Sequence, residues 1–309
     1  MVTRTRGLTP GGLGTVLRRA VAGWWNDNVP HLGAALSYYT LFSLAPILIV
    51  AISIAGAAFG AEAVRGEIVG QIDGLVGHEG AQAVQAMLEG AAKPSSSIPA
   101  TIIGVITFFL GATGAILELQ TALNAIWRVK PKAGGSFLRS LIIDRLTSFG
   151  LVVGVGFLML TSLLVSAGLA ALHTYMGETF PGGAVLLEAV NVIVSLAVIS
   201  VLFAMVYKLL PDVELAWGDV WVGGLVTAGL WTVGKFLIGL YLGTSAFASS
   251  YGAAGSVIVL LIWVYYSAQI ILLGAEFTRE YVREFGRKPP PSEFATKDPA
   301  PPLGGKGGR

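Results

Sequence analysis

The chain of 309 residues contains no cysteine, three histidines and few charged residues, and each shortage excludes a class of protein. Without cysteine there is no disulfide, no thiolate nucleophile and no Cys-ligated zinc. His31, His78 and His173 form no H-x-H or H-E-x-x-H cluster, and the sequence has no GxxxxGK[ST] loop. These absences argue against a metal hydrolase and against an ATP-driven pump working alone. Charged residues make up 12% of the chain, against about 25% in a soluble domain, which predicts an integral membrane protein.

Long apolar segments dominate what is present, because 54% of the residues are hydrophobic. Runs of the roughly 20 residues that a membrane-spanning helix needs occur at 32–59, 98–127, 146–172, 184–210, 220–243 and 252–277. The sequence lacks the ten-residue segments of alternating polarity that are typical of outer-membrane barrels. We therefore expect an all-α, polytopic membrane protein, a six-helix transmembrane bundle with short amphipathic external and interfacial helices.

Basic residues are concentrated at one end of the predicted spans. Sixteen of the twenty Lys and Arg residues lie before span one, between spans two and three, or after span six. Because loops on the cytoplasmic side of a membrane carry the excess of Lys and Arg, both termini are predicted to be cytoplasmic. An even number of spans agrees with this orientation.

Residues 1–30 are predicted to form a cytoplasmic arm with an interfacial amphipathic helix. Arg18 and Arg19 lie on one side of this helix, and an apolar face lies on the other. That face carries Leu13, Leu17, Val21 and Trp24. The pattern is typical of a helix lying on a membrane surface, and a solvated arm is the alternative.

The membrane domain is predicted to cover residues 31–285, with one long external loop at 60–97. Apolar residues recur in this loop at helical spacing and predict two short amphipathic helices that pack over the bundle. They are Val64, Ile68, Ile72, Leu75, Val84, Met87 and Leu88. Residues 286–309 are rich in Pro and Gly and are predicted to form a disordered cytoplasmic tail.

Three polar residues are predicted to lie deep in the outer half of the membrane. Lys235 lies about eight residues before the outer end of span five, which corresponds to a depth of roughly 12 Å. An ionisable residue at such a depth marks a functional site by default. Glu188 and Asn191 of span four lie at a comparable depth and could pair with Lys235. The alternative is a structural pair, or a lysine side chain that extends outward to the interface.

A second polar group is predicted toward the cytoplasmic side. Glu118 and Asn124 belong to the last turns of span two, whereas Gln269 and Glu276 belong to the end of span six. Gln269 and Glu276 are seven residues apart and share one helix face, which favours contact with protein or water over lipid. Alternatively, Glu276 begins a charged extension of the helix at i+3 and i+4 spacings, and Glu118 is solvated at the end of its helix.

Four motifs occur in order along residues 20–285. They are "ALSYYTLFSLAPIL" (35–48), "ALNAIWRV" (122–129), "YKLLPDVELAW" (207–217) and "YGAAGSVIVLLIWVYYSAQIILLGAEF" (251–277). Together they resemble the YihY/BrkB family of bacterial inner-membrane proteins. The resemblance implies a six-helix bundle in the bacterial cytoplasmic (inner) membrane with both termini in the cytoplasm. Some members of this family are associated with virulence.

The resemblance also carries over individual residues. The matching positions are Tyr38, Tyr39, Pro46, Pro211, Tyr251, Gly252, Gln269, Gly274 and Glu276. Pro46, within span one, also predicts a kink or break there. The sequence departs from the family at Gly218, where a basic residue is expected, and this weakens any assignment of the short inner loop to anionic headgroups. The family was once labelled ribonuclease BN, but the histidines described above argue against carrying that activity over.

Two classes of function follow. The first is a transporter or flippase for a hydrophobic or lipid-linked substrate, with a polar-lined cleft between spans one, two, four, five and six. Lys235 would lie on the outer side of this cleft and Gln269 on its inner side. The alternative is a non-catalytic membrane scaffold or envelope-assembly factor. Neither is an enzyme, and no metal, cofactor or nucleic acid is predicted. Membrane lipids are the expected partners, and homo-oligomerisation is left open.

Overall fold

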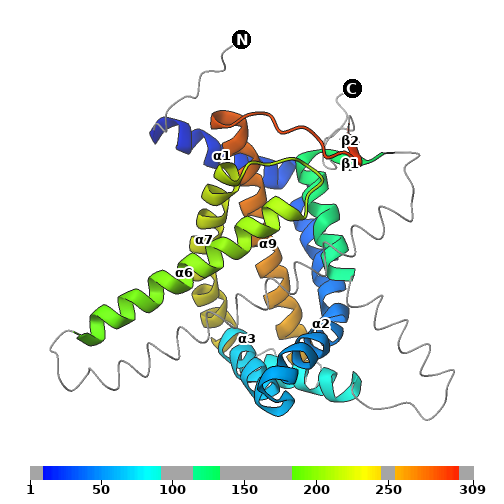
Figure 1. Ribbon diagram of the computed structural model, residues 1–309, viewed down its shortest axis with the longest axis vertical. Coiled ribbons are helices and arrows are strands. Elements are labelled where there is room, and N and C mark those ends of the chain that lie inside the picture. Colours follow the sequence, from blue (N-terminus) through cyan, green and yellow to red (C-terminus); the bar gives the residue numbers. More distant parts are fainter. Residues whose placement is uncertain (1–9, 92–113, 133–182, 245–254, 299–309) are drawn as a thin grey trace. The chain divides into compact units, whose positions relative to one another are not determined.

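The computed structural model describes residues 10–91, 114–132, 183–244 and 255–298, and these are almost entirely helical (Figure 1). The helices are α1 (Pro10–Asn26), α2 (Val29–Phe59), α3 (Ala61–Ala91), α6 (Gly183–Leu209), α7 (Trp217–Thr244) and α9 (Gly255–Phe285), with a further helix at residues 114–127. Two short strands, β1 (Val129–Pro131) and β2 (Ala295–Lys297), form an antiparallel pair.

Four helices in the described part of the chain are long and apolar enough to cross a membrane. The segments concerned are Val29–Ser53, Ala189–Leu209, Trp217–Tyr241 and Gly255–Phe285. They coincide with the predicted spans one, four, five and six. The predicted span at 146–172 lies outside the described residues, and the span at 98–127 is described only from residue 114, where it is helical. The helical membrane class is confirmed, and six remains a predicted number of spans.

The chain divides into two compact units. Unit 1 comprises the described residues of Met1–Ala22, Ile126–Thr232 and Gly274–Pro299, and unit 2 comprises those of Gly23–Ala125 and Val233–Leu273. In unit 1, Val16 and Ala20 of α1 form a buried core with Phe277 of α9. In unit 2, a second core joins α2, α3 and α9 through Ile52, Val64, Ala83, Val84, Leu88, Leu260 and Val264.

The turn between α1 and α2 follows from two residues. Asn28 adopts a left-handed conformation with φ of 56°, which asparagine tolerates better than most residues. Pro30 lies in the first turn of α2, where its missing N–H has no intrahelical partner to lose. Pro46 lies inside α2, which continues through it to Phe59. The helix therefore does not break at Pro46, which was one of the two outcomes predicted there.

The segment after α2 forms two helical stretches, as its apolar spacing predicted. Gly77 interrupts α3 with a φ of 78°, a conformation that an L-residue rarely adopts. On the N-terminal side of this interruption Val64 is buried, and on the C-terminal side Val84 and Leu88 are buried in the core of unit 2. Both stretches thus pack on α2 and α9 through the predicted residues.

Helix α1 has two apolar faces, whereas the sequence pattern predicted one. Leu13, Leu17 and Val21 are exposed, as expected for a face that meets a membrane. Val16 and Ala20 are fully buried and face the protein. The contact of the exposed face with a membrane surface stays a prediction.

The chain after α9 is ordered as far as Asp298, which corrects the prediction of a disordered tail from residue 286. Residues 295–297 form β2 and pair with β1. Composition suggested disorder because Pro and Gly dominate this segment, but backbone pairing with a distant part of the chain holds it. Residues 299–309 lie outside the described part.

Candidate functional site

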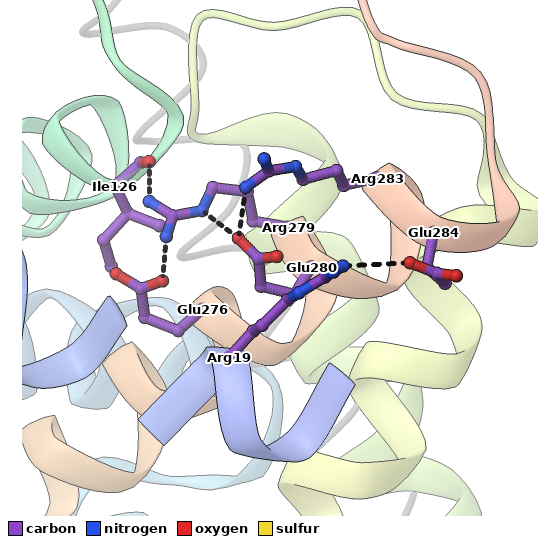
Figure 2. A network of polar contacts seen from close by, with 7 residues as sticks. All are labelled: Arg19, Ile126, Glu276, Arg279, Glu280, Arg283 and Glu284. Carbon is purple, nitrogen blue, oxygen red and sulfur yellow. Dashed lines mark hydrogen bonds and ion pairs between the residues drawn. The ribbon is translucent and has the colours of Figure 1, made fainter. Parts of the chain in front are cut away.

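A cluster of charged side chains surrounds the C-terminal end of α9 in unit 1 (Figure 2). Three carboxylates and two guanidiniums come from α9 itself, because acidic and basic residues alternate at i+3 and i+4 spacings along its last turns. A third guanidinium comes from α1. The members are Glu276, Arg279, Glu280, Arg283, Glu284 and Arg19. Their formal charges cancel.

Arg279 is the centre of this cluster. Its Nη2 lies 2.6 Å from Oε2 of Glu276, and its Nε lies 3.4 Å from Oε1 of Glu280. Its Nη1 donates a hydrogen bond of 2.7 Å to the backbone oxygen of Ile126. Ile126 lies in the last turn of the helix at 114–127, where carbonyls lack intrahelical partners and where positive charge is favourable. One guanidinium therefore neutralises α9 and caps a second helix.

Two of the three acidic members of the cluster, Glu276 and Glu280, are deeply buried. The side chain of Glu276 is 0% exposed and that of Glu280 is 4% exposed, whereas that of Arg279 is 15% exposed. A buried carboxylate is tolerated only when a cation and hydrogen bonds compensate for the lost water. The exposed Arg283 contributes a longer contact of 3.6 Å to Glu280. At the outer edge, Nη1 of Arg19 lies 2.9 Å from Oε2 of Glu284 and joins α1 to α9.

Gln269 is held by a different partner, in unit 2. The indole Nε1–H of Trp24 donates a hydrogen bond of 3.0 Å to Oε1 of Gln269. Because the indole can only donate, this contact fixes which end of the amide faces Trp24. The other end, Nε2, is buried without a hydrogen-bond partner in the described part of the structure. This Nε2 lies against Gly33, and a Cβ atom on residue 33 would overlap it. The lack of a side chain at Gly33 therefore makes the space for Gln269.

Lys235 lies on an exposed face of α7. Its neighbour Gly234 packs closely on α9, where a Cβ atom would lie 3.0 Å from the hydroxyl of Tyr266. Ile238, one turn later, is also buried. The Lys235 side chain consequently points away from this contact, beside the exposed Phe236. Within residues 10–91, 114–132, 183–244 and 255–298 it makes no hydrogen bond or ion pair.

The other residues of the predicted cleft are only partly described. The side chain of Glu188 lies outside the description, and Asn191 of α6 is half-buried and belongs to unit 1, whereas Lys235 belongs to unit 2. Their pairing with Lys235 therefore stays a prediction. Glu118 is half-buried and Asn124 is buried. The placement of Glu118, Gln269 and Glu276 in one wet vestibule also stays a prediction.

Glu276 has the contacts that the alternative interpretation of its sequence position described. It begins the charged end of α9, and its compensating group is the guanidinium of Arg279. The sequence placed Arg279 in this charged extension of the helix and counted it among the cytoplasmic basic residues, but did not single it out as the counter-ion of Glu276. The i+3 spacing of the two residues was visible in the sequence, but the contact of Arg279 with Ile126 joins positions that are distant in the chain. The role of Trp24 was likewise missed, because Trp24 was assigned to the exposed face of α1.

Tyr38 and Tyr39 form part of an exposed aromatic group on α2. The ring centroids of Tyr38 and Phe42, one turn apart, are separated by 4.9 Å, and those of Tyr38 and Tyr39 by 5.7 Å. All three side chains are exposed. They are available to contact lipid or substrate, and their predicted place in a cavity is untested.

Of the residues predicted to be structural, Gly274 is the one whose contacts most clearly require glycine. A Cβ atom there would overlap the hydroxyls of Thr227 and Tyr207, which lie 2.9 Å from each other. Gly274 therefore lets α9 approach α6 and α7 closely in unit 1. Pro211 is buried in the link after α6, and its carbonyl accepts a hydrogen bond from the N–H of Val213. Gly252 lies outside the described residues.

The described residues contain no group of three or more His, Cys, Asp or Glu side chains that could hold a metal ion. What the arrangement can do chemically is to neutralise charge and bind polar groups. Within the described part, the ion pairs of the α9 cluster and the Trp24–Gln269 hydrogen bond lock helices together. The exposed ammonium of Lys235 is available to an anionic group.

Comparison with known proteins places the chain among bacterial membrane proteins of one family. A UPF0761 membrane protein of Rhodospirillum centenum is 31% identical over 90% of this chain, and one of Ralstonia nicotianae is 29% identical over 84%. A third, from Psychrobacter, is 27% identical over 85%. The chain spans 60%, 56% and 47% of these relatives, respectively.

No solved structure matches the chain significantly. The profile of the family described as "Virulence factor BrkB" matches residues 20–298, nearly the whole of the described chain. The four motifs that suggested this relationship lie within the matched residues. The chain is a membrane protein and belongs to the BrkB family.

Proposed function

We propose that the protein is a transporter or flippase of a lipid or lipid-linked molecule that carries an anionic headgroup. The observation that carries this proposal is the exposed side chain of Lys235. It lies about six residues, or roughly 9 Å, before the end of the membrane-length segment Trp217–Tyr241. A lysine in a membrane span costs about 2.5–3.5 kcal/mol at the bilayer centre on insertion scales. An anionic headgroup that reaches Lys235 would offset that cost.

The surroundings of Lys235 fit an amphipathic ligand. Phe236, Leu237 and Leu240 are exposed apolar residues on the same part of α7. Apolar side chains next to a single ammonium group offer contact with both acyl chains and a phosphate. Lysine binds phosphate as a compact point charge and does not need a fixed orientation of the ligand. This surface therefore favours a class of anionic amphipaths over one exact molecule.

The route of the substrate is the cleft predicted between spans one, two, four, five and six. Lys235 would receive the headgroup on the outer side, and Gln269 and Glu118 would face it on the inner side. Membrane lipids would be both surroundings and substrate, and the proposal includes no catalytic step. The uncovered apolar face of α1 would rest on the inner membrane surface, with the exposed Arg18 beside it.

The test uses the purified chain in vesicles. Fluorescent phosphatidylglycerol and fluorescent phosphatidylcholine are followed separately as they cross the bilayer. Lys235→Met is expected to slow the anionic lipid while thermal stability stays unchanged, and Lys235→Arg is expected to retain movement. Leu240→Met, at another exposed position of α7, is the matched control. Wild-type vesicles that move neither lipid faster than empty vesicles would contradict the proposal, as would equal rates in Lys235→Met and wild type.

A second candidate, a non-catalytic scaffold or envelope-assembly factor, is favoured by the α9 cluster. There the buried carboxylates are compensated by guanidiniums of the protein itself. Polar groups that satisfy one another in this way specify packing and need no substrate. Under this reading the vesicle assay shows no lipid movement, and Lys235→Met is neutral or stabilising.

A further inference from the structure

The chain does not leave the protein at the end of α9 but runs back over two links of unit 1. The segment concerned, residues 289–298, is called the C-terminal clasp here. It first meets the link at 210–216 between α6 and α7, and then the segment at 128–132 that follows the helix at 114–127. In Figure 1 its second half is the strand β2, drawn beside β1.

The first contact of the clasp is with the α6–α7 link. Pro291 forms an antiparallel bridge with Val213. The N–H of Glu214 donates a hydrogen bond of 3.0 Å to the carbonyl of Pro290, and the N–H of Ser292 donates one of 2.9 Å to the carbonyl of Asp212. Val213 is buried beneath this contact. Prolines suit the position because the clasp supplies carbonyls here, which proline retains.

The second contact is the ladder of β1 and β2. Lys130 is directly opposite Thr296, and Pro131 is opposite the buried Ala295. Hydrogen bonds continue beyond both ends of the ladder, from the N–H of Lys132 to the carbonyl of Phe294 and from the N–H of Asp298 to the carbonyl of Arg128, each of 2.9 Å.

Side chains of the same segment add to the ladder. The Nζ of Lys132 donates a hydrogen bond of 2.6 Å to the carbonyl of Glu293. The Nζ of Lys130 lies 3.3 Å from Oδ1 of Asp298. The clasp thus holds two links that are far apart in the sequence and that continue into α6, α7 and the helix at 114–127.

We propose that the clasp is a releasable device that fixes the spacing of these two links, and that it opens as one unit before the helices unfold. A two-stranded sheet of this size is marginally stable by itself. Local openings begin where few apolar contacts are buried and where hydrogen bonds lie near solvent. Apart from Ala295 the clasp residues are exposed or half-buried, whereas the helices that it joins carry fully buried residues such as Leu123, Ala204 and Val220.

The proposal does not depend on the proposed transport of lipid. It requires only that the two contacts be coupled. If the clasp opens as a unit, closing it at the β1–β2 ladder also protects the contact at 212–214. If it is merely two separate contacts, closing one leaves the other unchanged.

The test exploits the lack of native cysteine. Lys130→Cys and Thr296→Cys together place two thiols on directly opposite residues, whose Cα atoms lie about 4.5–5.5 Å apart in an antiparallel pair, within the range that a disulfide spans. Oxidation should form this bond in the folded protein. We expect hydrogen exchange at the N–H of Glu214 to slow by about tenfold or more in the oxidised form relative to the reduced form.

Truncation supplies the second measurement. Removal of residues 289–309 should accelerate exchange at 128–132 and 212–214 by about tenfold or more, whereas removal of residues 299–309 alone should change neither. If the shorter chain does not fold, the oxidised and reduced forms of the cysteine pair decide the question. Unchanged exchange at Glu214 after oxidation would overturn the proposal, and so would failure of the two cysteines to form an intramolecular disulfide.

Discussion

Nη2 of Arg279 lies 2.6 Å from Oε2 of Glu276, one helical turn earlier on α9, and the Glu276 side chain has no exposure to solvent. The same guanidinium donates a hydrogen bond to the carbonyl of Ile126. A carboxylate as deeply buried as this one is costly without a cation beside it. Arg279 is therefore both the counter-ion of Glu276 and the link between α9 and the backbone of Ile126 in unit 1.

Arg279→Met is expected to destabilise the protein strongly, by about 3–5 kcal/mol, because it leaves a buried carboxylate uncompensated. The double variant Glu276→Met/Arg279→Met should recover part of this loss, since it removes the stranded charge as well. Thermal unfolding of the purified protein in detergent measures both effects.

Arg283→Met is the matched control for this cluster. The Arg283 side chain is 67% exposed and lies 3.6 Å from Glu280, and exposed ion pairs of this kind contribute about 1 kcal/mol or less. Equal losses of stability in Arg283→Met and Arg279→Met would show that the central role assigned to Arg279 is wrong.

A second prediction concerns the hydrogen bond between Trp24 and Gln269. Trp24→Phe removes the indole N–H and leaves the amide oxygen of Gln269 without its donor, which costs about 1–3 kcal/mol when the acceptor is buried. Adding Gln269→Leu should restore stability, because both ends of the amide are then gone. Trp25→Phe is the control, since Trp25 is 72% exposed. Thermal unfolding again provides the measurement, and a Trp24→Phe protein as stable as wild type would argue against this contact.

The third prediction separates two glycines that look alike in the sequence. Gly274→Ala should destabilise by about 1–3 kcal/mol, as overpacking does, because its methyl group would overlap Thr227 and Tyr207. Gly229→Ala should be neutral or stabilising by about 0.5–1 kcal/mol, the helix preference for alanine, because a Cβ atom there meets nothing within 4 Å. The reverse order of stabilities in detergent would contradict the packing described for α9.

The sequence predicted the elements of this fold where local pattern determines them. Apolar length located α2, α6, α7 and α9, and the spacing of Val64, Val84 and Leu88 predicted both stretches of α3. The clasp could not be predicted in this way. Its ladder pairs residues 129–131 with 295–297 through backbone atoms, and backbone pairing between distant segments leaves little trace in composition.

In the candidate site, too, the sequence predicted what depends on local pattern and missed what depends on contacts between distant segments. The depth of Gln269 and Glu276 marked them as polar residues that need partners, and the structure gives them Trp24 and Arg279. The identity of these partners depends on helix rotation and on contacts between distant segments. In α1 the exposed apolar face continues with Trp25 and not with Trp24. The Trp24 side chain instead donates a hydrogen bond to Gln269. A hydrophobic pattern cannot distinguish two adjacent tryptophans.

The last prediction is that both termini face the cytoplasm. The distribution of Lys and Arg motivates it, and one contact adds to it: Arg19 of α1 lies 2.9 Å from Glu284 at the end of α9. An ion pair between the first helix and the end of the last described helix requires both to lie on the same side of a membrane.

A reporter enzyme active only outside the cytoplasm should therefore be silent when fused after Arg309. The same reporter inserted after His78, in the exposed interruption of α3, should be active. Activity after Arg309 together with silence at His78 would reverse the orientation, and the same result at both positions would exclude an even number of spans.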